Sequence, residues 1–413
     1  MPSSIMLKNQ IPKEVLLILQ RLKKAGYHAY IVGGAIRDSL LDRTITDWDL
    51  CTSANTQNIK YLFSDCRQFI LHPGTCVILL SGKQYEITSF KGEKPDGLNH
   101  DLACRDFTIN AMAYNPDIKE IIDPFGGQGD IAHKIIKAVK DPVKRIQEDP
   151  LRILRGLRIS TDLGFNLDPK TMQAIIKYNY LLKTIAQERI REELVKILLT
   201  TRPSVGFKLM IRTGTLKIIL PELLEGYLKR QNDYHRFTIF RHIMETVDSV
   251  RADPLMRLTA LFHDIAKPRV RKKVESQWRF FGHEEASANM AEEIMGRLRF
   301  SNKMIRQVKN LIKNHLIGYN SGWSDAAVRR LIRRVGSEQI MKLIEFRRAD
   351  LIAHGKNLDN LKLIDKLEKR VGYELQSSQN ISKLAIDGRT IMKALGLSPG
   401  VQVGQIKKNY WKK

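Results

Sequence analysis

Cysteine is scarce in this 413-residue sequence, and its placement excludes two common structural uses. Four thiols occur near the start of the chain, none in a Cys-x-x-Cys pair: Cys51, Cys66, Cys76 and Cys104. A cysteine zinc site is therefore excluded, and a disulfide framework is disfavoured in a chain of this length. The thiols are expected to be free, as in the reducing cytoplasm.

Long apolar runs are missing as well. The opening segment, MPSSIMLKNQIPKEV, lacks the apolar core of a secretory signal, and no run long enough to span a bilayer follows. The sequence also contains no internal repeat and no low-complexity segment. We therefore expect a folded cytoplasmic protein with no membrane partner.

Acidic residues are few relative to basic ones. The sequence has 44 Asp and Glu against 69 Lys and Arg, a net charge of +25. Such an excess favours a polyanionic partner, because neutralising phosphates releases condensed counterions. The alternative is a basic surface that is only solvated. The length predicts two to four domains, because single cores stop growing at roughly 250–300 residues.

Hydrophobic periodicity separates a mixed first part from a helical remainder. Residues 11–25 have helical spacing, and Gly26 is a typical stop. Strand-like segments follow at HAYIVGG (28–34), TDWDLCTS (46–53), CVILLSG (76–82) and QYEITSF (84–90). After a Gly-rich turn at 123–131, the chain becomes almost wholly helical from about residue 140. The expected fold class is α+β, a small mixed α/β head followed by all-α parts.

Two aspartates in one strand-like segment suggest a divalent cation. Asp47 and Asp49 are two residues apart, so a strand places both carboxylates on the same face. Such acids repel one another unless a cation bridges them, and paired Mg²⁺ ions serve phosphoryl transfer. Upstream, Gly33 and Gly34 would let backbone N–H groups approach a triphosphate, and Arg37 would clamp its phosphates.

These motifs in this order, VGGAIRD (32–38) and then TDWDLCTSA (46–54), resemble the nucleotide-binding signature of one family. It is the class II tRNA nucleotidyltransferase (CCA-adding enzyme) and bacterial poly(A) polymerase family. The resemblance is close over 28–200 and looser towards the C-terminus. It implies a polymerase-beta-like head in which Asp47, Asp49 and Glu86 hold Mg²⁺. It also implies sugar contacts from CRDFTINAMAY, namely Arg105, Asp106 and Asn110.

Four charged residues after the head recur at every third position. Their spacing predicts that they share one face of a helix: Asp149, Arg152, Arg155 and Arg158. The resemblance implies that Asp149 and Arg152 stand in for a template base, whereas Arg155 and Arg158 face the triphosphate. A carboxylate and a guanidinium pair with the edges of cytosine and adenine but are mispaired with guanine and uracil.

The link before RDFTIN departs from the family pattern. It is only KGEKPDGLNHDLAC (91–104), whereas relatives that complete CCA usually have a longer, flexible segment there. Relatives that add only CC characteristically lack that segment. Cys104 also stands where the family usually has an arginine that contacts the ribose. CC-only addition is therefore an alternative to CCA addition.

A histidine-rich series in the helical remainder suggests a second metal. Its members are His242, His263, Asp264, His283, His315 and Asp350. Neutral imidazoles with carboxylates suit a transition metal, and the ordered series resembles the HD phosphohydrolase domain. His235 and His354 are placed outside the ligand set. The segment 386–408 resembles the helix-turn-helix that closes HD-bearing members of the family.

The leading hypothesis is an enzyme that adds CCA to the tRNA 3′ end from CTP and ATP with Mg²⁺. The alternatives are CC-only addition, a poly(A) polymerase, and an HD phosphohydrolase whose N-terminal part binds RNA. A membrane or DNA partner is not expected. The predicted parts are a head (1–138), a neck with the base-reading helix (139–228), an HD-type domain (229–370) and a helical tail (371–413).

Overall fold

The computed structural model describes residues 11–91, 97–231, 237–275, 277–354, 359–382 and 388–410. The chain forms two compact units, one comprising Met1–Ile197 with Val205–Ile219 and the other Leu198–Ser204 with Leu220–Lys413. None of the described helices combines the length and apolar character that crossing a bilayer requires.

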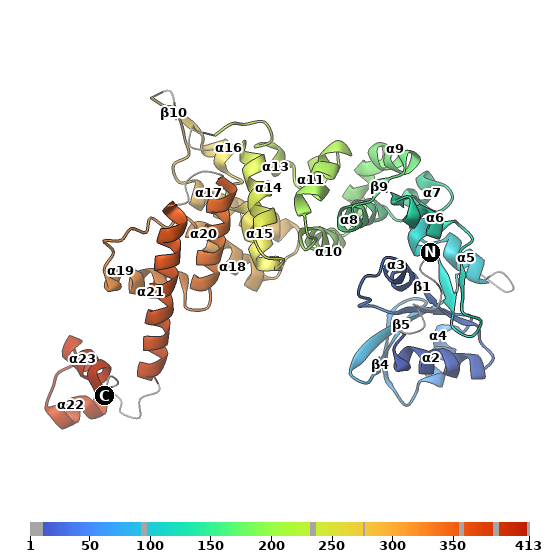
Figure 1. The fold of residues 1–413 in the computed structure, drawn as a ribbon, viewed down its shortest axis with the longest axis horizontal. Coiled ribbons are helices and arrows are strands. Elements are labelled where there is room, and N and C mark those ends of the chain that lie inside the picture. The colour runs from blue at the N-terminus through green and yellow to red at the C-terminus, as the bar shows by residue number, and fades with distance from the viewer. Residues whose placement is uncertain are drawn as a thin grey trace. The chain divides into compact units, whose positions relative to one another are not determined.

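A seven-stranded mixed sheet forms the base of the first unit (Figure 1). Its order is β3-β4-β5-β2-β1-β6-β7, with β2 and β5 parallel and the other neighbours antiparallel. The strands are β1 (Ala29–Val32), β2 (Asp49–Thr52), β3 (Arg67–His72), β4 (Thr75–Leu80), β5 (Lys83–Ser89), β6 (Ala113–Asn115) and β7 (Glu120–Ile122). The four strand-like segments are confirmed, although β2 begins at Asp49, so Asp47 lies just before it.

Helices surround the sheet and continue beyond it. They are α2 (Lys13–Lys24), α3 (Gly34–Leu40), α4 (Thr56–Leu62), α5 (Gly97–Ala103), η1 (Thr108–Asn110), α6 (Gly127–Ala132), α7 (Pro142–Glu148), α8 (Arg152–Leu163), α9 (Pro169–Tyr178), η2 (Asn179–Thr184), α10 (Gln187–Leu198), α11 (Pro203–Arg212) and α12 (Leu216–Ile219). Two short strands, β8 (Ile135–Ile136) and β9 (Asn166–Leu167), pair in parallel among them.

The α2 helix shows how the sequence pattern produces the core. Val15, Ile18, Leu19 and Leu22 recur at helical spacing and are buried against the sheet, with α4 beside them. The helix ends where expected, because Gly26 adopts the positive φ that suits glycine. The opposite face of the sheet has a smaller core, to which α5 contributes Leu102, and this face carries the candidate site.

The four charged residues of the base-reading segment do not share one helix, which corrects the sequence prediction. Asp149 lies between α7 and α8 in an extended conformation, with φ −146° and ψ 96°. Pro150 is the cause, because the residue before a proline is forced out of the helical region. Arg152, Arg155 and Arg158 follow on α8.

The segment 123–131 is also more ordered than the expected turn. Its second half forms α6, and the Asp123 carboxylate accepts the backbone N–H groups of Gly127 (2.7 Å) and Gln128 (2.9 Å). These bonds satisfy two donors that a helix N-terminus otherwise leaves free. The helix packs against η1, which carries Asn110.

The second unit is mainly helical. Its elements are α13 (Pro221–Leu224), α14 (Ile239–Ser249), α15 (Pro254–Phe262), α16 (Lys267–Val270), β10 (Lys272–Val274), β11 (Gln277–Arg279), α17 (His283–Arg297), α18 (Asn302–Lys313), α19 (Asp325–Val335), α20 (Ile340–His354), α21 (Asp359–Ser382), α22 (Gly388–Leu395) and α23 (Val401–Tyr410). The β10–β11 hairpin is a departure from the expected all-helical remainder. The described part of 386–408 forms the helix pair α22–α23, and residues 386 and 387 lie outside the described residues.

Gly127 gives a test of the packing beneath the site. A Cβ at this position would lie 2.4 Å from the Thr108 carbonyl oxygen, so η1 would have to move. We expect Gly127→Ala to lower the free energy of unfolding by roughly 1–3 kcal/mol, as overpacking does. Gly129→Ala on the same helix meets no atom within 4 Å and is the matched control, expected to be neutral or slightly stabilising. Denaturant unfolding measures both, and equal stability of the two variants would contradict the packing argument.

Candidate active site and metal centre

A cavity of about 510 Å³ lies on the α5 face of the first unit. Most of the site residues expected from the sequence line it: Gly33, Gly34, Arg37, Asp47, Asp49, Arg105, Asp106, Asn110, Asp149, Arg152, Arg155 and Arg158. Glu86 is not among the lining residues. The fold therefore brings together residues that are more than a hundred positions apart in the chain.

The carboxylates at the cavity repel one another. Asp49 is opposite Glu86 in the parallel β2–β5 register, and Asp47 is exposed just before β2. Burial raises the pKa of Asp49, and Asp47 adds to this, whereas Arg105 lowers it. Burial also raises the pKa of Glu86, and Asp49 and Asp47 contribute. A desolvated group of acids whose anionic forms are disfavoured is the environment that a bound divalent cation relieves, so these residues fit Mg²⁺.

Gly33 leaves open the space above this acid group. It has a φ of +77° and precedes α3. A Cβ there would lie 3.1 Å from Nη1 of Arg105 and 3.4 Å from Oδ2 of Asp49. A side chain at position 33 would therefore fill the space beside the acids, where the backbone is otherwise free to approach a phosphate.

A chain of hydrogen bonds joins polar residues on the cavity wall. Arg37 donates from Nη1 to the amide oxygen of Asn110 (2.8 Å), and Asn110 donates from Nδ2 to Asp106 (3.1 Å). The second oxygen of Asp106 pairs with Arg155 at 2.8 Å. Burial would raise the pKa of Asp106, but Arg155 and Asn110 outweigh it and the pKa is lowered. Asp106 therefore stays ionised and fixes the positions of its neighbours.

The two expected base-reading side chains already have partners. Asp149 accepts from Arg189 (3.0 Å) and from the backbone N–H of Leu151 (3.2 Å). Arg152 donates from Nη2 to the carbonyl oxygen of Cys104 (2.7 Å) and pairs with Glu148 (3.2 Å). These contacts orient both side chains, and the Asp149 carboxylate retains acceptor capacity for a further donor.

Several cavity residues were not found from the sequence. Asp101, which is buried, pairs with Arg105 at 3.2 Å and holds it over the acids. Their i, i+4 spacing across the end of α5 was the available signal. His72 and Lys91 also line the cavity. Of the short link 91–104, residues 92–96 lie outside the described residues.

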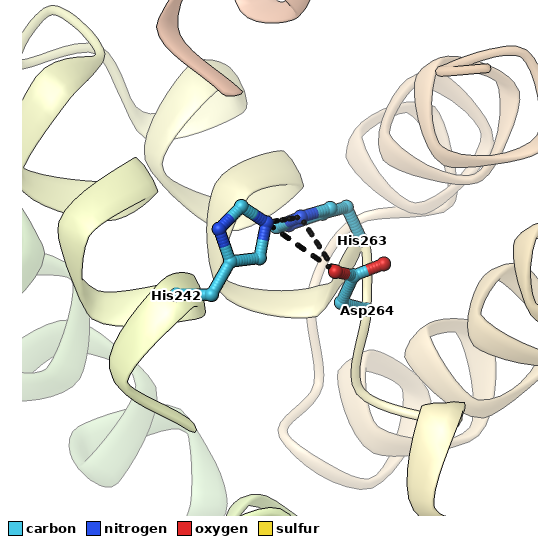
Figure 2. Close-up of side chains that lie close together, drawn as sticks. All are labelled: His242, His263 and Asp264. Carbon is cyan, nitrogen blue, oxygen red and sulfur yellow. Dashed lines mark hydrogen bonds and ion pairs between the residues drawn. The ribbon is translucent and has the colours of Figure 1, made fainter. Parts of the chain in front are cut away.

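In the second unit, four ligand atoms converge on one point. Figure 2 shows His242 and His263 directed towards the carboxylate of Asp264. Nε2 of His242 lies 3.4 Å from Oδ2 of Asp264 and 3.0 Å from Oδ1 of Asp350. Nε2 of His263 lies 3.2 Å and 3.5 Å from the same two oxygens. Ligands bound at roughly 2.0–2.2 Å to one metal ion are separated by similar distances.

Asp264 also belongs to a second group. Its Oδ1 lies 3.3 Å from Nε2 of His283 and 3.9 Å from Nε2 of His315. Oδ1 of Asp264 and Nε2 of His283 are buried and have no hydrogen-bond partner among the described residues. Leaving such groups unpaired is costly. Both groups, His242–His263–Asp264 and Asp264–His283–His315, have ligand atoms within 4.8 Å of one another.

The backbone fixes which ring nitrogen of His263, His283 and His315 faces the cluster. Nδ1 of His263 lies 2.9 Å from the Ala260 carbonyl oxygen. Nδ1 of His283 and of His315 lies 2.7 Å from the carbonyl oxygen three residues earlier. A nitrogen facing a carbonyl oxygen carries the proton, so Nε2 of each ring is the atom available to a metal.

Charge within this buried cluster is balanced by neighbouring cations. Burial lowers the pKa of His242 to about 4 and that of His315 to about 3, so both rings are neutral. Burial also opposes protonation of His263, but Asp264 and Asp350 outweigh it and raise its pKa to about 10. Lys267 pairs with Asp264 at 2.6 Å, and Arg347 pairs with Asp350. Lys267 and Arg347 offset the carboxylate charge. The donor set itself, imidazoles with carboxylates, is one that transition metals prefer, so the six residues fit such an ion.

Three neighbours of this cluster were missed from the sequence. His354, set aside there, lies beside it, because its ring centroid is 4.5 Å from that of His242 and its Nδ1 is 2.7 Å from the Asp350 carbonyl oxygen. Lys267 and Arg347 are each three residues from an aspartate ligand, a spacing that could have indicated them. With Arg279 they line a cavity of about 360 Å³ beside the cluster. His235 lies outside the described residues.

Comparison with known proteins assigns each of these regions. Residues 29–137 match the model of the poly A polymerase head domain, which identifies this part of the first unit as a nucleotidyltransferase head. Residues 164–226 match the probable RNA and SrmB-binding site of polymerase A, and 235–354 match the HD domain.

Relatives and solved structures agree with this assignment. The CCA-adding enzyme of Limosilactobacillus reuteri is 30% identical over 408 residues, 94% of this chain and 89% of the relative. That of Anoxybacillus flavithermus is 42% identical over 228 residues, 52% of this chain, and the match spans 57% of that relative's length. The crystal structure of the Bacillus stearothermophilus CCA-adding enzyme in complex with CTP is 26% identical, with a TM-score of 0.66 over 97% of this chain and 91% of that one. The chain belongs to the CCA-adding enzyme family.

The metal centre can be tested through Asp264. We expect Asp264→Asn to weaken the binding of a transition metal such as Zn²⁺ by at least about tenfold, since an uncharged amide replaces the carboxylate that both groups share. Metal titration of the stripped full-length protein, followed by the rise in melting temperature, measures this. Glu338→Gln, an exposed acid of the same unit, should bind as wild type does. Equal binding by Asp264→Asn and Glu338→Gln would contradict the assignment.

Proposed function

We propose that the protein is a tRNA nucleotidyltransferase that adds the 3′-terminal CCA from CTP and ATP without a template. The observation that carries the proposal is one cavity that combines the acid pair, the open Gly33 position and the Asp149–Arg152 pair. The similarity to CCA-adding enzymes over nearly the whole chain supports it. The neck and tail boundaries predicted from the sequence form part of this proposal.

The chemistry follows from the arrangement at the acids. The RNA 3′ oxygen forms a bond to the α-phosphorus of the nucleotide, its O–H bond breaks, and pyrophosphate leaves. Mg²⁺ held by Asp47, Asp49 and Glu86 would supply positive charge to the phosphates and the attacking oxygen. Arg37 and Arg105 lie on the same wall and bind phosphate or sugar oxygens. Asp101 positions Arg105 for this contact.

Base selection is assigned to Asp149 and Arg152. The carboxylate accepts from the amino group of cytosine or adenine, and the guanidinium donates to the neighbouring ring acceptor. Guanine and uracil present a carbonyl and a ring N–H there, which leaves buried groups mispaired at about 1–3 kcal/mol each. Arg189, which pairs with Asp149 at 3.0 Å, keeps this carboxylate oriented for the contact.

The short link 91–104 favours a second candidate, addition of CC only. In the family pattern the missing segment accompanies the change from CTP to ATP, and Cys104 replaces an arginine there. A poly(A) polymerase shares the head motifs and remains an outcome of the same assay. So does a protein that binds RNA with its first unit and hydrolyses phosphates with its second.

For the second unit we propose transition-metal binding and a phosphohydrolase activity. The convergence of His242, His263, Asp264 and Asp350 supports it, with His283 and His315 completing the set. A metal in such a site would activate a water molecule as nucleophile. Lys267 and Arg347 lie at the neighbouring cavity, where they can contact phosphate oxygens.

An incorporation assay tests the proposed reaction. A tRNA that ends at its discriminator base is given CTP, ATP or both, and growth by three residues with both nucleotides is expected. Growth by two residues that ATP does not extend identifies CC addition, and long ATP-dependent tails on unrelated RNA identify a poly(A) polymerase. We expect Asp47→Asn to lower the rate on the order of a thousandfold or more, because the cation site loses a ligand. Glu120→Gln, an exposed acid on β7, is the control, and full activity of Asp47→Asn would refute the mechanism.

Base selection has its own test. Asp149→Ala should reduce the preference for CTP over UTP by roughly five- to a hundredfold, in line with the cost of about 1–3 kcal/mol for one mispaired group. The ratio of kcat/KM values for the two nucleotides measures this. Glu188→Ala on α10 removes an exposed carboxylate next to Arg189 and should leave the ratio unchanged. An unaltered ratio in Asp149→Ala would assign selection to other residues.

A further inference from the structure

Positive charge is concentrated in one stretch of the second unit. Residues 302–342 contain nine Lys and Arg but only two Asp and Glu. A tenth of the chain therefore carries more than a quarter of its net charge of +25. The stretch consists of α18, α19, the connections that follow them and the first turn of α20. It lies outside the residues 164–226 that match an RNA-binding model.

The α19 helix separates apolar and basic residues onto two faces. Val328, Leu331 and Val335 are buried in the unit. The exposed side chains on the other face are Arg330, Arg333 and Arg334. They recur at i, i+3 and i+4, so they are neighbours on the helix surface. Over about 6 Å of helix, three guanidinium groups face solvent together.

These three arginines differ from other arginines of the unit. Arg329 pairs with Glu374 at 3.1 Å and Arg370 with Asp325 at 2.7 Å, and Arg348 pairs with two acids of α21. In the described part of the chain, no carboxylate oxygen lies within 4.0 Å of the guanidinium groups of Arg330, Arg333 or Arg334. Uncompensated like charges repel one another, which disfavours this arrangement unless a polyanion neutralises it.

Two further exposed cations lie on α18, which contacts the end of α19. Asn310 on α18 donates from Nδ2 to the Val335 carbonyl oxygen at the end of α19, at 2.7 Å. Arg306 and Lys303 are exposed one and two turns before Asn310 on the same side of α18. The α18–α19 basic surface is the name used here for the exposed cations of these two helices, Lys303, Arg306, Arg330, Arg333 and Arg334.

The chemistry of this surface suits phosphates rather than bases. Proteins that bind single strands present exposed aromatic rings for stacking. In the described residues of 302–342, the large exposed apolar side chains are Leu316 and Met341, neither of them aromatic. Arginines without aromatic neighbours instead contact the phosphates of helical RNA, which is recognised mainly by shape and backbone.

We propose that the α18–α19 basic surface binds the phosphate backbone of a double-helical segment of the RNA whose 3′ end the first unit extends. The inference rests on the proposed function, because an RNA substrate is assumed. The cavity of about 510 Å³ in the first unit has room for a nucleotide and an RNA end, not for a folded RNA. A second contact on the helical part adds affinity for folded RNA without reading its sequence.

The test removes the three α19 charges from the full-length protein. Arg330→Gln, Arg333→Gln and Arg334→Gln are combined, because glutamine keeps a high helix propensity. Lys13→Gln, Lys24→Gln and Lys60→Gln, exposed positions on α2 and α4, form the matched control. Circular dichroism and melting temperature establish that both variants fold. Kd is measured at several salt concentrations for a tRNA that ends at its discriminator base and for a short single-stranded RNA.

We expect the arginine variant to bind the tRNA roughly tenfold or more weakly, with a salt slope of log Kd reduced by about two to three. Its affinity for single-stranded RNA and the slope of the lysine control should match wild type. A tRNA slope equal to wild type overturns the proposal, as does an equal loss for both RNAs, which would indicate a surface without preference for helical RNA. If wild type binds tRNA but incorporates no nucleotide, the proposed function fails. The salt dependence of log Kd for tRNA still shows whether the α18–α19 basic surface binds RNA.

Discussion

Alternate residues of a strand point to opposite faces of its sheet, and the candidate site of the first unit depends on this alternation in and just before β2. Trp48 and Leu50 are buried in the core shared with α2 and α4. Asp49 and Cys51 lie on the other face. The parallel register then sets Glu86 beside Asp49. Burial of the apolar residues therefore fixes where the acids lie, although the acids repel one another.

In the second unit, charged residues are buried inside a helical core. Asp264 and Asp350 are almost completely buried, and isolated carboxylates would be costly there. Lys267 and Arg347, each three residues away along the chain, provide compensating charge. The histidines stay in place because backbone carbonyl groups hold their Nδ1 atoms. Contacts between residues three positions apart thus supply both the charge balance and the ring orientation.

Local patterns predicted much of this architecture. The apolar spacing of α2 and the buried strands β1, β4 and β5 are visible in the sequence, because burial imposes their periodicity. The site residues followed from ordered motifs. Asp149 was wrongly predicted to lie on a helix with the three arginines. The prediction relied on the three-residue spacing of the charges and did not consider that Pro150 makes the preceding residue extended. The hairpin β10–β11 was missed because its strands are short and largely exposed, so no alternation of apolar residues marks them.

Contacts between distant elements could not be predicted in the same way. No local signal connects Asp149 with Arg189, since Asp149 lies between α7 and α8 and Arg189 on α10, and the two meet only through packing. The ligand order of the second unit was visible, but the sharing of Asp264 between two groups depends on how α14, α17 and the end of α18 approach α15. His354 was excluded for the same reason.

The two oxygens of Asp264 face different sets of imidazoles, Oδ2 towards His242 and His263 and Oδ1 towards His283 and His315. One carboxylate is therefore common to both groups, and its charge cannot serve one without affecting the other. An ion held by the first set would change the affinity of the second, and thermodynamic linkage would make the reverse effect equal in size. Metal binding at the two groups would consequently be coupled, whatever the sign of the coupling.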